Sequence, residues 1–277
     1  MIEEKVKKNI SFFFSQRLIK NSFYTGLALS FVGIIPFTFN FLVARSFGRE
    51  ILGSINITLS FCLIITIFIT NFFGSAGNKY LAEYRGSRKL EHFQFVLKVM
   101  LGTPLIILSI ISIILSWNWS YFSNKFSLQK DLLIPIIIYI FLRSFYILFR
   151  RTLYGIDLVK SYTANEIISD LIMLSAIGYV TYNKQSSFLI ECYLLSYFIF
   201  CLLSTGTLMK RFKSIKNNLN MSSHFDKRRV IKKFTHYGLV SMLGTVASTG
   251  TGYLSIIVIG MYLSNSDAGI YSSVLSI

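Results

Sequence analysis

Charged residues are scarce in this sequence. They make up 14% of the 277 residues, whereas a soluble domain carries about a quarter. Acidic residues are the rarest, with 12 Asp and Glu against 28 Lys and Arg. Hydrophobic residues make up 53% of the chain and come in long unbroken blocks. Each block reaches the roughly 20 residues that a helix needs to cross a bilayer. These features exclude an ordinary soluble domain and indicate a membrane protein.

Cysteine and histidine are also few, with three of each. The cysteines lie inside hydrophobic blocks, and neither residue type has the spacing of metal ligands. The sequence also lacks a Walker A phosphate-binding loop and the acidic motif of membrane glycosyltransferases. We therefore expect no metal, no cofactor, no catalytic residue and no enzyme activity.

The hydrophobic blocks predict an all-α fold, a polytopic transmembrane helical bundle. Barrel strands would instead alternate over ~10 residues, and no such alternation is visible. We expect seven full spans and the beginning of an eighth near residue 269. The seven are 22–44, 54–77, 93–117, 132–149, 166–182, 188–209 and 235–263. Because the last residue falls inside the eighth span, we expect the natural protein to continue.

Basic residues predict the orientation of these spans. With the N-terminus in the cytoplasm, the internal segments hold 22 Lys and Arg and the external ones hold five. This asymmetry is the pattern of a multi-pass protein of the cell membrane with a cytoplasmic N-terminus. The net charge of +16 is spread between hydrophobic blocks, so we expect no nucleic-acid partner.

The same pattern divides the chain into four parts. Residues 1–21 form a cytoplasmic segment, 22–209 a first lobe of six spans, 210–234 a basic linker and 235–277 the start of a second lobe. The linker either serves topology alone or also contacts anionic headgroups, at ~1 kcal/mol per basic residue. A weak internal repeat aligns GSINITLS with GIYSSVLS, starting at Gly53 and Gly269. Such parallel repeats are typical of transporters.

Three short passages resemble those of polysaccharide-exporting flippases, within the superfamily of multidrug and oligosaccharidyl-lipid exporters. The first passage is FLVARSFGREILGSINITLS, starting at Phe41. The others are GNKYLAEYRGSRK from Gly77 and SNSDAGIYSSVLSI from Ser264. The resemblance implies that a two-lobed protein moves a lipid-linked oligosaccharide to the outer face by alternating access. It also implies membrane lipids as partners and a polysaccharide polymerase or export machinery as a candidate partner.

Two other functions stay open. A cation-coupled multidrug or metabolite antiporter of the same superfamily would have an acidic, aromatic-lined cavity, and a flippase a basic one. Span 22–44 contains no Asp or Glu, which disfavours the antiporter. A membrane polysaccharide polymerase would carry a large external loop, but the longest expected external connection is only 118–131.

Arg143 is the leading candidate for the substrate path, because a charge inside a membrane is costly. It either binds the pyrophosphate or acidic sugars of the glycan or pairs with Asp170 or Glu166. These two carboxylates are one helical turn apart and share a face. Asp170 is also a candidate for proton or sodium coupling.

Three further residues are weaker candidates for the substrate path. Arg45 ends the first span and either anchors it at the interface or guides the glycan head. Asn40 and Asn71 lie within spans and either line the path or form interhelical hydrogen bonds, worth about 0.6 kcal/mol. The small, polar run GTVASTGTG from Gly244 is expected to line a cavity or pack against another helix.

Overall fold

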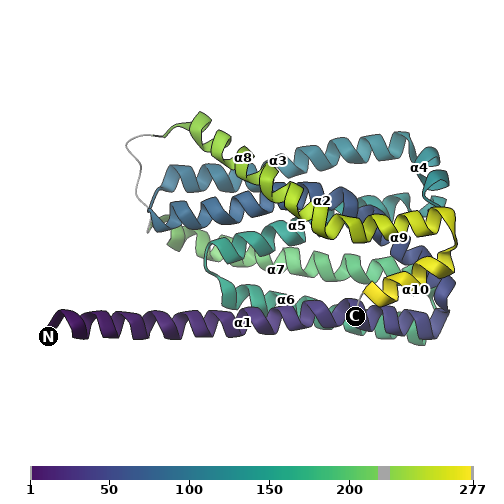
Figure 1. Ribbon diagram of the computed structural model, residues 1–277, viewed down its shortest axis with the longest axis horizontal. Coiled ribbons are helices and arrows are strands. Elements are labelled where there is room, and N and C mark those ends of the chain that lie inside the picture. The colour runs from purple at the N-terminus through teal and green to yellow at the C-terminus, as the bar shows by residue number, and fades with distance from the viewer. Residues whose placement is uncertain (1, 218–224, 276–277) are drawn as a thin grey trace.

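The computed structural model describes residues 2–217 and 225–275, and all regular structure in that part of the chain is helical (Figure 1). The predicted all-α bundle is confirmed. The helices are α1 (Ile2–Phe47), α2 (Arg49–Gly86), α3 (Leu90–Trp117), α4 (Trp119–Lys125), α5 (Leu133–Gly155), α6 (Val159–Tyr182), α7 (Leu189–Asn217), α8 (Lys227–Thr245), α9 (Thr251–Tyr262) and α10 (Asn265–Leu275). Three short helices complete them: η1 (Lys130–Leu132), η2 (Ser186–Phe188) and η3 (Val246–Gly250).

Six segments of the described chain are long and apolar enough to cross a membrane. They comprise α1 from residue 19, α2, α3, α5 with η1, α7 with η2, and the rod formed by α8, η3 and α9. The chain is thus a multi-pass membrane protein. Pro135 sits in the first turn of α5, where a helix tolerates the missing N–H. Pro135 is therefore compatible with an unbroken α5.

Helix α6 differs from the other predicted spans because it is too polar to belong to those six segments. It also begins at Val159, ahead of the predicted start. Hydrogen bonds to neighbouring helices satisfy two of its polar side chains. The Thr163 hydroxyl donates to the Tyr24 carbonyl of α1 over 3.0 Å, and the Asn165 amide donates to the Ser204 hydroxyl of α7 over 3.2 Å. Neighbouring helices therefore hold α6 in the bundle.

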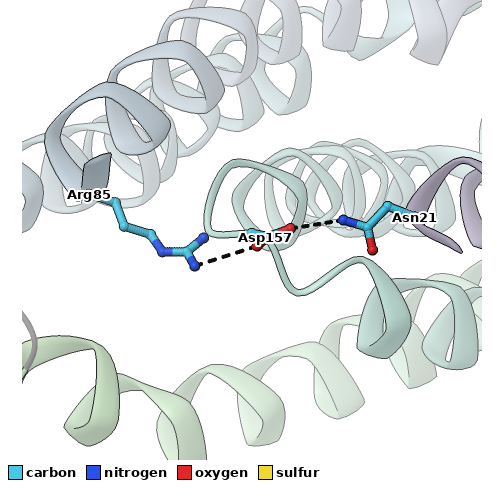
Figure 2. A network of polar contacts seen from close by, with 3 residues as sticks. All are labelled: Asn21, Arg85 and Asp157. Carbon is cyan, nitrogen blue, oxygen red and sulfur yellow. Dashed lines mark hydrogen bonds and ion pairs between the residues drawn. The ribbon is translucent and has the colours of Figure 1, made fainter. Parts of the chain in front are cut away.

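One end of the bundle, here called the basic end, contains the α2–α3 turn, the α5–α6 turn and the start of α8 (Figure 1). A polar network ties three elements together there (Figure 2). The Asp157 carboxylate in the α5–α6 turn accepts a hydrogen bond from the Asn21 amide of α1 over 3.1 Å. It also lies 3.6 Å from the Arg85 guanidinium at the end of α2. The network links α1, the α5–α6 turn and the end of α2.

At the opposite end, α10 crosses the start of α2 (Figure 1). The crossing is close because glycines face each other. A Cβ added to Gly53 would lie 3.0 Å from the Gly269 nitrogen, and one added to Gly269 would lie 3.1 Å from the Gly53 nitrogen. The two backbones could not approach this closely if either residue carried a side chain.

Candidate functional site

A cavity of about 420 Å³ lies between α1, α2, α5, α6 and the α8–α9 rod. Three arginines, Arg143, Arg150 and Arg151, are the charged residues that line it, and no described carboxylate does. We call it the cationic cavity. Threonines and asparagines of α2, such as Thr66 and Asn78, form the facing wall. A cavity with this lining can hold an anion.

Helix α5 presents the three arginines because of their spacing. Arg143 and Arg150 are seven residues apart, two turns of a helix, so they share a face. Arg151 flanks Arg150 on the cavity side. The predicted span 132–149 leaves Arg150 and Arg151 in a cytoplasmic connection, but α5 continues to Gly155. The two-turn spacing between Arg143 and Arg150 is the sequence feature that could have placed Arg150 on the same face of the helix.

A second cavity of about 510 Å³ adjoins the first and extends toward the α2–α10 crossing. The two cavities share Arg143, together with Leu63, Thr249 and Tyr253. We call the second one the tyrosine cavity, because five tyrosines line it. They are Tyr139, Tyr146, Tyr193, Tyr197 and Tyr253. Such rings offer an apolar face and a hydroxyl together. Their positions on three different helices gave no signal in the sequence.

Tyrosines surround the Arg143 guanidinium. One of its nitrogens donates to the Tyr197 hydroxyl over 3.0 Å. Its central carbon lies 5.2 Å from the Tyr146 ring centroid and 5.1 Å from that of Tyr197, within cation–π range. No carboxylate of the described residues lies within ion-pair distance of Arg143. Two aromatic rings and one hydroxyl thus stabilise the guanidinium charge, and the Arg143 side chain lines both cavities.

The two candidate carboxylates, Glu166 and Asp170, lie on α6. Glu166 is fully buried and accepts a hydrogen bond from the Tyr146 hydroxyl. Asp170 is 6% exposed and lines the tyrosine cavity. Each carboxylate has one buried oxygen without a hydrogen-bond partner among the described residues. Burying an unpartnered carboxylate oxygen is costly, and a bound proton or cation would lower that cost.

A family model for polysaccharide biosynthesis proteins matches residues 18–277 of the chain. The chain belongs to this family. No curated protein and no solved structure matches it. The predicted family is confirmed, and with it a role in polysaccharide biosynthesis at a membrane.

The remaining candidate residues, Asn40, Asn71 and Arg45, lie in different parts of the protein. Asn40 is buried in the tyrosine cavity, where its side-chain oxygen accepts from the Asn56 amide over 3.1 Å. Asn71 lines the cationic cavity and donates to the Ile67 carbonyl of its own helix. Arg45 is exposed in the last turn of α1, outside both cavities.

The small, polar run from Gly244 lines both cavities. Thr245 and Thr249 face the cationic cavity, and Ser248 and Thr249 face the tyrosine cavity. The run contains a π-helical turn, η3, between α8 and α9. Such turns widen a helix locally and are frequent at functional sites. The rod therefore presents hydroxyls to the cavities, as the sequence predicted.

Proposed function

We propose that this protein is a flippase that carries a lipid-linked oligosaccharide from the cytoplasmic to the outer face of the cell membrane. The observation that carries the proposal is the cationic cavity, which has Arg143, Arg150 and Arg151 and no carboxylate among its described lining residues. Guanidinium groups stay charged and bind phosphate oxygens in a bidentate manner. The pyrophosphate of the substrate is the ligand expected there.

The tyrosine cavity supports the sugar part of this proposal. Its five rings and the buried amides Asn40 and Asn56 offer apolar faces, donors and acceptors. Sugars present the complementary combination of C–H faces and hydroxyls. The isoprenoid tail would stay in the bilayer while the sugar head occupies the two cavities.

The contact between α2 and α10 supports movement by alternating access of two lobes. Gly53 meets Gly269, and the Asn56 amide donates to the Ser272 hydroxyl over 2.8 Å. Both pairs join positions 216 residues apart, the offset of the internal repeat. A contact between equivalent positions is expected on a two-fold axis between repeated lobes. We propose that residues 22–209 form the first lobe and that the second begins at 235.

The distribution of basic residues supports the orientation. The basic end carries Arg85, Arg88, Lys89 and the start of α8. We propose that it faces the cytoplasm, together with the N-terminus. The cationic cavity would then open toward the side on which the substrate is made.

A cation-coupled antiporter is the second candidate, and Asp170 is the observation that favours it. This carboxylate lines an aromatic cavity and has one unpartnered oxygen among the described residues. A cation or proton bound at Asp170 could drive either exchange of a drug or movement of the glycan.

The test is a translocation assay with purified protein in liposomes. A fluorescent lipid-linked oligosaccharide is placed in both leaflets, and an impermeant reagent bleaches only the outer one. Transport makes the protected pool accessible, so bleaching should proceed to completion with protein and stop at about half without it. If bleaching stops at half in liposomes with and without protein, and the protein expels a cationic dye under a proton gradient, the antiporter proposal replaces the flippase proposal.

A further inference from the structure

A third cavity, of about 290 Å³, lies between α2, α3 and α8. It shares no lining residue with the cationic or tyrosine cavity. Phe72 and Phe73 of α2 line it, with Val99 on the α3 side and Ile231 and Phe234 on the α8 side. Two threonines are its only polar lining residues within the described chain. We call it the apolar cavity.

The apolar cavity exists because α8 is fixed to α2. Gly238 lets α8 approach so closely that an added Cβ would lie 2.9 Å from the Phe72 carbonyl oxygen. One turn nearer the basic end, the Tyr80 hydroxyl donates to the Lys233 carbonyl over 3.1 Å. Helix α3 packs on the same helix α2. A space remains between α3 and α8, and it lies over the rings of Phe72 and Phe73.

Cations lie directly beyond this cavity toward the basic end. Lys227 and Arg228 precede Ile231 by four and three residues, so they share its face of α8 one turn away. Both side chains are exposed. The neighbouring carboxylate, Asp226, accepts from the backbone N–H groups of Arg228 and Arg229 as the helix N-cap. This face therefore offers two cations above an apolar space.

We propose that the apolar cavity and the start of α8 together bind one anionic phospholipid. Its acyl chain fills the space over Phe72 and Phe73, and its phosphate contacts Lys227 and Arg228. The ligand must be an amphiphile, because the apolar lining and the cations are one helical turn apart. A lipid here is resident and distinct from the cargo, because the cavity shares no lining residue with the two substrate cavities.

Native mass spectrometry of the purified full chain with added phosphatidylglycerol tests the headgroup contacts. The double substitution Lys227→Gln and Arg228→Gln should weaken binding of the first lipid about 25-fold. The matched control, Lys210→Gln with Arg211→Gln, removes the same charge from exposed positions at the end of α7 and should change binding less than twofold. Equal weakening by both doubles would indicate diffuse attraction and overturn the site.

The apolar contacts are tested by filling the cavity. Val99→Phe should weaken binding about tenfold, because the ring displaces part of the acyl chain. The control Ile106→Phe enlarges an exposed residue of the same helix and should have no effect. Unchanged binding in Val99→Phe would overturn the proposal. So would displacement of phosphatidylglycerol by equimolar polyprenyl phosphate, which would assign the cavity to the cargo. These measurements use no transport readout, so they stand or fail separately from the flippase proposal.

Discussion

The cationic cavity and the tyrosine cavity share Arg143 and part of one wall, yet their chemistry differs. The first has three arginines and no carboxylate among its described lining residues, and polar side chains of α2 complete it. The second has five tyrosines, and Arg143 and Asp170 are its charged lining residues within the described chain. The cationic cavity is therefore suited to bind a charged group, and the tyrosine cavity is suited to bind sugar rings. A substrate with a pyrophosphate at one end and sugars at the other would match this division, and the predictions below test whether the division is functional.

Arg143 belongs to both cavities, so its loss should have the largest effect. We expect Arg143→Gln to reduce translocation about hundredfold, because hydrogen bonds to a charged group contribute roughly 1.5–3 kcal/mol. The liposome assay measures this at equal protein levels. Lys98→Gln, which removes a charge from an exposed position on α3, is the control. A fully active Arg143→Gln protein would contradict the proposed substrate path.

The next prediction concerns the crossing of α2 and α10. We expect Gly53→Ala to destabilise the protein by about 2 kcal/mol, because the methyl group would push α10 away from α2. Thermal unfolding in detergent measures the change. Gly102→Ala is the control, since an added Cβ there meets no atom within 4 Å. Equal unfolding temperatures for Gly53→Ala and Gly102→Ala would mean that the helix crossing is not tight.

A double substitution should distinguish the function of the cationic cavity from that of the tyrosine cavity. Arg150→Gln with Arg151→Gln leaves the tyrosine cavity intact and should raise the substrate concentration for half-maximal transport about tenfold. The maximal rate should change little, because these residues serve capture at the basic end. A lowered maximal rate with unchanged half-saturation would assign them to the transport step instead.

The smallest effect is expected from one hydroxyl. Tyr197→Phe keeps the ring over Arg143 and removes the hydrogen-bond acceptor, so transport should fall about fivefold, for ~1 kcal/mol. Tyr197→Ala removes the ring as well and should lower transport further. If the two variants transport equally, the ring contributes nothing and the tyrosine cavity loses its proposed role in sugar binding.

Several features of the site could be predicted from the sequence. The cost of a charge in a hydrophobic block pointed to Arg143 and Asp170, and both line the tyrosine cavity. The small, polar run from Gly244 was expected beside a cavity for similar reasons. Arg150 and Arg151 were missed, because a pair of arginines at the end of a hydrophobic block is also what a cytoplasmic loop looks like.

The position of helix α6 in the bundle does not follow from its amino-acid composition. Its polar residues keep it outside the six apolar segments, but contacts with α1 and α7 hold it in the bundle. A polar helix of this kind depends on partners that are distant in the chain. The hydrogen bonds of Thr163 and Asn165 span 139 and 39 residues.

The sequence by itself determined the helical class, the long apolar segments and the family, because these depend on local composition and short passages. The tertiary structure decided which face of each helix lines a cavity. In a membrane, lipid-facing and protein-facing surfaces are both apolar, so the pattern along a helix does not separate them. Only the packing brings Arg143 of α5 to Tyr193 and Tyr197 of α7 and Gly53 to Gly269, since each contact joins different helices.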